Sequence, residues 1–282
     1  MADLILRGRI PPMEQAAVGI FDSGVGGLSV WRRIVARLPL ESTLYIADQA
    51  HVPYGPRRAR QIRSFCEAIT ERLLAEGCKA VVVACNTASA VALHHLRERF
   101  PAIPILGLEP AVKPAVALTR SGVVGVMATP ATFQGRLYRA TVGRHASQVR
   151  VVEQMCPGLA DLVERADLSD GATAAEAEAM LRQFVDPMLA QGADTIVLGC
   201  THYPFVIEPI RRLVGSELTV IDPAPAVARQ LERVLERCGL RSDGHTPSHR
   251  FATSGDPGRF DRSARWLVGV TAASAPLHWQ AF

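Results

Sequence analysis

Lysine is almost absent from this chain, in which Lys79 and Lys113 are the only two among 282 residues. Pyridoxal phosphate enzymes hold their cofactor through a Schiff base to a lysine. Lys79 precedes a predicted strand instead of following one, and Lys113 lies between Pro110 and Pro114. Neither position suits a cofactor lysine, so we expect chemistry that needs no cofactor.

Long apolar runs and closely spaced cysteine pairs are also missing. No apolar stretch reaches the length of about 18 residues that a membrane helix needs, and residues 1–17 lack the apolar core of a signal peptide. We therefore expect a cytoplasmic protein without a membrane partner. The six cysteines form no C-x-x-C pair, which argues against a zinc ribbon, and no metal is expected. Cys66, Cys78 and Cys238 fit buried packing positions.

Charge of one sign is not concentrated in this chain. The formal net charge is only +4, and acids are interspersed among the basic residues. The one basic cluster, at residues 57–63, fits a solvated helix face, so we expect no nucleic-acid partner. An apolar content of 48% supports well-packed cores, and the chain length favours two domains.

Short apolar runs alternate with amphipathic stretches, which is typical of parallel α/β sheets. The expected strands are residues 18–21, 43–47, 80–84, 105–107, 122–127, 148–153, 195–198, 218–221 and 251–253. The expected helices are residues 28–38, 58–76, 88–100, 172–191, 227–238 and 259–268. Because the pattern repeats, we predict two pseudo-symmetric open-sheet α/β domains with the active site in the cleft between them.

Cys85 and Cys200 occupy matching positions in the two halves. Each follows an apolar run, residues 80–84 or 195–199, and each precedes polar residues where a helix could begin. Open α/β sheets bind ligands at the carboxyl ends of their strands. Two thiols placed there could face each other across one small substrate. One would remove a proton from carbon while the other delivers a proton to the opposite side, which predicts inversion of a stereocentre.

Each thiol needs a supporting group, because a free thiol is mostly protonated near neutral pH. Asp22 could reach Cys85 if their strands are neighbours, and His202 or Glu164 could support Cys200. A Cys–His hydrolase is a competing interpretation. We expect it to fail, because adjacent residues on a turn rarely bring the base against the thiol.

Two loops that follow predicted strands could line a polar pocket. Residues 22–28 are rich in glycine and open a helix, so their backbone amides could hold a carboxylate. Asp22 and Ser29 depart from a dinucleotide-binding fingerprint. In the other loop, Tyr54 and the amide of Gly55 could face the same pocket, although a structural turn explains them nearly as well.

Together these motifs resemble the aspartate/glutamate racemase family, and within it the glutamate racemases. The matching segments are residues 19–28, 53–55, 84–88, 156–157, 162–164, 199–204 and 253–256. The resemblance covers about residues 18–269 and implies an enzyme without cofactor or metal that interconverts L-glutamate and D-glutamate for peptidoglycan synthesis. The chain departs from the family pattern in its longer start, residues 1–17, and at Ala111 and Phe205.

The resemblance assigns roles residue by residue. Cys85 and Cys200 would be the acid–base thiols for the D- and the L-enantiomer, respectively. Asp22 would assist Cys85, while Glu164 and His202 would assist Cys200. The implied substrate contacts are Asp22, Ser23, Tyr54, Gly55, Asn86, Thr87, Thr129, Thr201 and His202.

The resemblance also implies two intertwined domains and is compatible with a homodimer. The expected division is a first domain of residues 18–108 plus 222–270, a second of residues 109–221, and an N-terminal extension of residues 1–17. Aspartate racemase is the nearest alternative, although Ser89 and His202 favour glutamate. A two-lobed binding module is the alternative from another class, and the two thiols argue against it.

Overall fold

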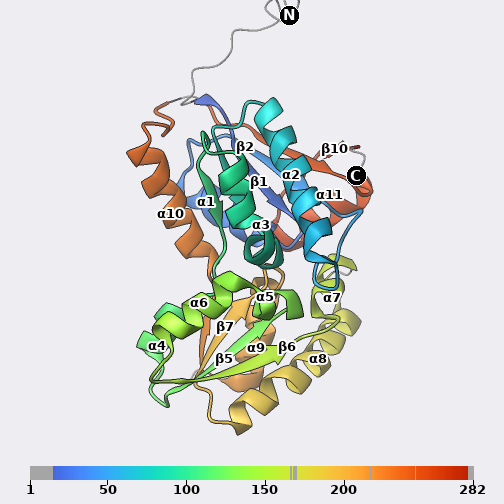
Figure 1. Ribbon diagram of the computed structural model, residues 1–282. Helices are drawn as coiled ribbons and strands as arrows, with labels where there is room; N and C mark the ends of the chain where they lie inside the picture. Colours follow the sequence, from blue (N-terminus) through green and yellow to red (C-terminus); the bar gives the residue numbers. More distant parts are fainter. Residues whose placement is uncertain (1–14, 166, 168–169, 216–217, 245, 279–282) are drawn as a thin grey trace, which may run out of the picture.

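The computed structural model describes residues 15–278 except 166, 168–169, 216–217 and 245. The chain forms two α/β domains, which lie one above the other in Figure 1. Most of the predicted extension, up to residue 14, falls outside the described residues. None of the helices in the described part combines the length and apolarity needed to cross a bilayer.

All the predicted strands and helices are present to within a few residues. The strands are β1 Val18–Asp22, β2 Thr43–Ala47, β3 Ala80–Val83, β4 Ile105–Gly107, β5 Val123–Ala128, β6 Arg150–Met155, β7 Thr195–Gly199, β8 Thr219–Ile221, β9 His249–Thr253 and β10 Ala275–Pro276. The helices are α1 Leu28–Arg37, α2 Ala59–Ala75, α3 Asn86–Arg99, α4 Val112–Leu118, α5 Pro130–Gln134, α6 Arg136–His145, α7 Leu159–Arg165, α8 Gly171–Ala190, α9 Ile207–Val214, α10 Ala224–Arg237 and α11 Pro257–Val268, with a 3₁₀ helix, η2, at Tyr203–Val206. The helices that the pattern did not predict, such as α4, α7 and α9, are mostly too short to show a clear period.

The strand order confirms the internal pseudo-symmetry. The first sheet has the order β10-β9-β2-β1-β3-β4 and the second the order β6-β5-β7-β8, with all pairs parallel. The run β2-β1-β3-β4 therefore matches β6-β5-β7-β8 strand for strand. Because β3 and β7 are equivalent in these orders, Cys85 and Cys200 follow equivalent strands.

The end of the chain returns to the first sheet. Strand β9 pairs with β2, and β10 pairs with β9. The sheet thus extends to Pro276, beyond residue 270, where the sequence-based division ended. The chain crosses between the two sheets twice, first between β4 and α4 and then between β8 and α10.

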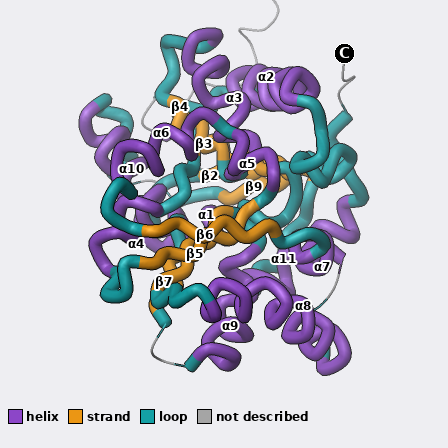
Figure 2. The backbone as a smooth tube through the Cα atoms, turned by 60° about the horizontal axis from the view of Figure 1, so that its bottom comes forward, coloured by secondary structure: helices purple, strands orange, loops and turns teal. Residues whose placement is uncertain are grey.

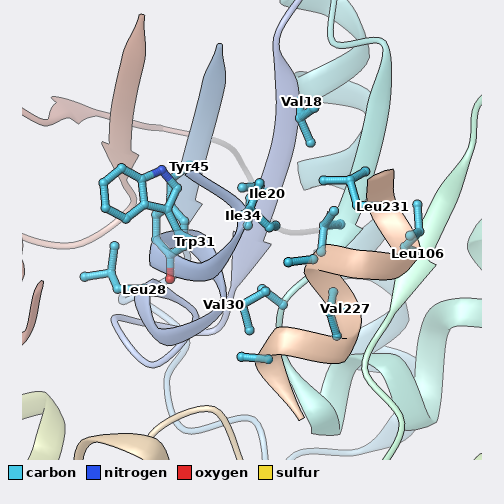
Figure 3. Close-up of a cluster of buried hydrophobic side chains, with 14 of the residues drawn as sticks. Val18, Ile20, Leu28, Val30, Trp31, Ile34, Tyr45, Leu106, Val227 and Leu231 are labelled. Carbon is cyan, nitrogen blue, oxygen red and sulfur yellow. The ribbon is translucent and has the colours of Figure 1, made fainter. Parts of the chain in front are cut away.

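Each sheet is covered by helices on both faces. Alternate residues of β1 point to opposite sides, so Val18 and Ile20 pack with α1 and α10 while Phe21 packs with α2 and α3. Figure 3 shows Trp31 of α1 and Leu231 of α10 in the cluster around Val18 and Ile20. In Figure 2 the strands of the second sheet lie between α6 and the pair α8 and α9. Each fully buried Val, Ile or Leu stabilises this arrangement by about 1.5–3 kcal/mol.

The cysteines outside the cleft behave as expected with one exception. Cys66 and Cys78 are buried in the core between the first sheet and α2 and α3. Cys238 is exposed, so its expected burial is wrong. It is the C-terminal cap of α10, where the helix meets the surface and its apolar face has already ended.

Candidate active site

Most of the predicted site residues line one cavity between the two sheets. They are Ser23, Tyr54, Gly55, Cys85, Asn86, Thr87, Thr129, Cys200, Thr201 and His202. Asp22 and Glu164 lie behind this lining and bond to residues in or next to it. Val52 and Ala160 also line the cavity. The sequence carries no signal for these two, because small apolar side chains are common in every environment.

The cavity is narrow, with a volume of about 30 Å³, which is room for about two water molecules. Both thiols line it and are close enough for the charge of one to affect the other. Two larger cavities of about 640 and 620 Å³ contain neither thiol. Size therefore does not identify the site, and the chemistry of the lining does.

Cys85 sits where β3 ends and α3 begins. Its sulfur accepts a hydrogen bond from the backbone amide of Ala88 at 3.4 Å and lies 3.7 Å from Oγ of Ser23. Burial, with the nearby charge of Asp22, raises the pKa of the Cys85 thiol well above its ordinary value. The thiol is therefore neutral and is able to donate a proton.

Asp22 is a fully buried carboxyl group at the end of β1. Its Oδ2 accepts a hydrogen bond from the Gly27 amide at 2.7 Å. Burial raises the pKa of Asp22 to about 6, although His202 and the Gly27 amide act in the opposite direction. A carboxyl group with such a pKa can both take and return a proton near neutral pH, and it lies beside Cys85 as expected.

Cys200 has a histidine and a carboxylate behind it. Nδ1 of His202 lies 3.5 Å from the Cys200 sulfur, and Nε2 lies 2.8 Å from Oε1 of Glu164. The argument against a Cys–His hydrolase assumed that the turn keeps His202 away from the thiol, and this assumption is wrong. The contact fits the other expectation, that His202 could support Cys200. Backbone turns at residues 200–202 and the start of η2 curl the chain, so the side chains two positions apart lie on the same side.

His202 and Glu164 form a buried ion pair, each side chain about 4% exposed. Burial alone would lower the pKa of His202, but its hydrogen bonds to Cys200 and Glu164 raise that pKa well above the ordinary value. Burial alone would raise the pKa of Glu164, but hydrogen bonds from His202 and Val25 outweigh it and hold that pKa below the ordinary value. The Cys200 side of the cavity thus carries a charged imidazolium–carboxylate pair, unlike the Cys85 side.

The glycine-rich loop after β1 does hold a carboxylate, but that carboxylate belongs to the protein itself. The Val25 amide donates to Oε1 of Glu164 at 2.7 Å, across the domain interface. A Cβ atom on Gly24 would lie 1.9 Å from the same oxygen, and one on Gly26 would lie 2.5 Å from Nδ1 of His202. The loop therefore needs glycine at these two positions so that the ion pair can approach it.

Other polar contacts also cross between the domains. Oγ1 of Thr87 lies 2.9 Å from Oγ1 of Thr129, and Oγ of Ser29 donates to the Thr201 carbonyl at 2.9 Å. Asn86 is different, because neither Nδ2 nor Oδ1 of its buried amide has a hydrogen-bond partner. An unpaired buried amide is costly, and this one lines the cavity.

The loop that carries Tyr54 is held by a residue that the sequence analysis did not single out. Asp48, at the end of β2, accepts a 2.6 Å hydrogen bond from the Tyr54 hydroxyl. The same carboxyl group contacts Nδ1 of His51 and accepts from Oγ of Ser254 at 2.7 Å. An acidic residue directly after a predicted strand is visible in the sequence and could have drawn attention to this position. Within the described residues, no cluster of three or more His, Cys, Asp or Glu side chains is arranged to bind a metal ion.

Comparison with known proteins agrees with this fold. Residues 19–231 match the model of the Asp/Glu/Hydantoin racemase family. The chain is 52% identical over 257 residues to a glutamate racemase of Pseudomonas aeruginosa, covering 91% of this chain and 96% of that one. The crystal structure of a glutamate racemase isoform from Bacillus anthracis has a TM-score of 0.85 at 34% identity, covering 94% of this chain and 98% of that one.

A glutamate racemase from Francisella tularensis, solved in complex with D-glutamate, has a TM-score of 0.82 at 25% identity and covers 94% of this chain and 98% of that one. The family match, the long alignment at 52% identity and the shared fold all indicate the same family of racemases. This chain belongs to the Asp/Glu/Hydantoin racemase family.

Proposed function

We propose that this protein interconverts L-glutamate and D-glutamate with Cys85 and Cys200 as its two proton-transfer groups. The observation that carries the proposal is that these thiols line one cavity from equivalent strands of two different domains. A carbon atom held between them would present one face to each sulfur. The glutamate assignment is supported by the relatives, one of which was solved with D-glutamate bound.

The proposed reaction moves one proton at each sulfur. Starting from L-glutamate, the Cys200 thiolate takes the Cα proton, and the electron pair of that C–H bond stays on carbon. The Cys85 thiol then delivers its proton to the opposite face, so the configuration is inverted and Cys85 is left as the thiolate. D-glutamate reacts by the reverse steps. Each positioned acid or base contributes a factor of about 10²–10⁴ to the rate.

Each sulfur would be supported by the groups behind it. Asp22, with a pKa of about 6, would accept the proton that Cys85 must lose before it acts on D-glutamate. The His202 imidazolium, hydrogen-bonded to Cys200, would stabilise negative charge on that sulfur. A two-base reaction requires one sulfur to start as a thiolate and the other as a thiol. The different groups beside Cys85 and Cys200 suit them to these different protonation states.

Substrate recognition is supported by the unpaired amide of Asn86. Its donor and acceptor both lack partners in the cavity wall, and glutamate offers carboxylates and an ammonium group to satisfy them. We propose that Asn86 and Thr87, at the start of α3, and Ser23, Tyr54, Gly55, Thr129 and Thr201 contact the substrate. Asp22, beside Cys85, and His202, beside Cys200, would also contact it.

Glutamate is much larger than this cavity of about 30 Å³, so the domains must open for it to enter. Two domains would move relative to each other. The first is residues 18–108 plus the returning segment from residue 222, which β10 extends to Pro276. The second is residues 109–221. After closure the site excludes water, which strengthens each electrostatic interaction inside it. The physiological role that we propose is the supply of D-glutamate for peptidoglycan.

The direct test is racemisation of L-glutamate by the purified protein without added cofactor, followed by circular dichroism. NMR in heavy water would measure exchange at Cα. We expect Cys85→Ala and Cys200→Ala each to abolish racemisation, and Cys78→Ala, which removes a buried thiol outside the cavity, to preserve it. Full activity in either cleft variant would refute the two-thiol assignment. Faster turnover of aspartate than of glutamate would show that aspartate, and not glutamate, is the preferred substrate.

A further inference from the structure

Gln49 connects the two domains next to the site but does not line the cavity. It follows β2 and is half-buried. Its Nε2 donates to Oε2 of Glu164 at 3.2 Å, and its Oε1 accepts from Oγ1 of Thr253 at 2.9 Å. Glu164 belongs to α7, whereas Thr253 ends β9 of the first sheet. One amide therefore joins the returning C-terminal strand to the ion pair behind Cys200.

The orientation of this amide is fixed by its neighbours. The Gly255 backbone amide donates to Oγ1 of Thr253 at 3.0 Å, which directs the hydroxyl hydrogen of Thr253 away, toward Oε1 of Gln49. The NH₂ group of Gln49 must then face Glu164, whose ionised carboxylate only accepts hydrogen bonds. Donors and acceptors are consistent along the whole chain from Gly255 to Glu164.

The two oxygens of Glu164 have different partners. Oε1 accepts from Nε2 of His202 and from the Val25 amide, whereas Oε2 accepts from Gln49. Contacts on both oxygens prevent the carboxylate from rotating, and the carboxylate in turn fixes the ring of His202 at 3.5 Å from the Cys200 sulfur. We propose that Gln49 is a positioning residue for the Cys200 half of the site and acts through Glu164 and His202. The kinetic test of this role measures racemisation of glutamate and therefore rests on the proposed function.

The proposal predicts how pH dependence responds to loss of Gln49. The titratable or charged groups around the ion pair are Cys200 on the same turn, Asp22 of β1, Tyr45 of β2 and Arg259 of α11, which donates to the Glu164 carbonyl. Loss of Gln49 leaves these groups in place and removes one donor from the carboxylate. Glu164 then binds a proton more readily and holds the His202 imidazolium less firmly.

The test compares Gln49→Leu with Gln154→Leu, which changes another half-buried glutamine. Among the described residues, the one hydrogen bond of the Gln154 side chain goes to the Met155 carbonyl. We expect Gln49→Leu to lower kcat/KM about tenfold, the value of a hydrogen bond to a charged group, and Gln154→Leu to have no effect. The loss must be equal for both enantiomers, because the equilibrium constant of a racemisation is one. The basic limb of the kcat/KM profile should move to lower pH in Gln49→Leu.

An NMR titration of the His202 ring separates this proposal from the proposed function, because it needs no substrate. Gln49→Leu should make His202 lose its proton at lower pH than in the unsubstituted protein. Gln49→Glu, which replaces the donor by an acceptor, should reduce kcat/KM more than Gln49→Leu. An unchanged His202 titration and pH profile in Gln49→Leu, even with a loss of thermal stability, would overturn the proposal. A protein that leaves glutamate unchanged would refute the proposed function and leave the titration decisive for Gln49.

Discussion

Gly24→Ala is the substitution that best tests how the domains meet. Gly24 has a backbone conformation open to other residues, since it is not among the glycines with positive φ. The added methyl group would nevertheless lie 1.9 Å from Oε1 of Glu164, where ordinary contact begins at about 3.4 Å. The carboxylate would have to withdraw from the loop, or the domains would have to remain apart.

The size of the effect follows from the contacts that the carboxylate would lose. Withdrawal breaks the hydrogen bonds of Glu164 Oε1 to the Val25 amide and to His202. At about 1.5 kcal/mol for each hydrogen bond to a charged group, the closed and assembled site is disfavoured by about 3 kcal/mol. This corresponds to a loss in kcat/KM of roughly 100-fold.

The assay is racemisation of L-glutamate measured by circular dichroism, with calorimetry to check that the variant folds. Gly143→Ala is the matched control, because the same methyl group meets nothing within 4 Å in α6. Combining Gly24→Ala with Glu164→Asp should restore part of the activity, since the shorter acid makes room for the methyl group. Wild-type kcat/KM in Gly24→Ala would show that the loop does not restrict the ion pair.

Two further predictions concern buried charges. Burial raises the pKa of Asp22 from 3.8 to about 6, so its ionisation costs the folded state about 3 kcal/mol as pH rises through this window. Asp22→Asn removes this cost, and urea titrations should show its stability relative to wild type growing between about pH 4 and 6 and then levelling off; a difference independent of pH contradicts this. Lys79 and Glu41 form a buried ion pair at 2.6 Å, so Lys79→Met should lose about 3–5 kcal/mol of unfolding free energy and Lys79→Met with Glu41→Leu should regain most of it. Urea denaturation measures both, and equal stability of Lys79→Met and wild type would contradict the second prediction.

The sequence predicted the sheets well because parallel strands are buried on both faces. Such strands appear as short continuous apolar runs, as at β3 and β7, and the helices between them are long enough to show a period. Helix α4 has only seven residues and no such signal. Strand β10 has only two, and its pairing with β9 depends on the return of the chain from a distant part of the sequence.

The candidate site was predicted unevenly for a physical reason. Cys85 and Cys200 could be found because a strand end followed by polar residues is a local pattern. The contact of His202 with Cys200 depends on the exact course of a turn, so the sequence supported arguments both for this contact and against it. The role of Gly24 and the position of Gln49 depend on Glu164, which is more than a hundred residues away in the chain and belongs to a helix of the other domain.

The double crossing of the chain limits how the enzyme can move. A protein whose halves are joined by a single linker can swing them in any direction, whereas here two linkers, at residues 108–111 and 222–223, would restrict such a motion at two points. Rocking about the line through both linkers is the motion that stretches neither. Each cycle of opening would therefore return the sulfurs to the same alignment, and exchange of a whole lobe between two molecules would require both linkers to extend at once.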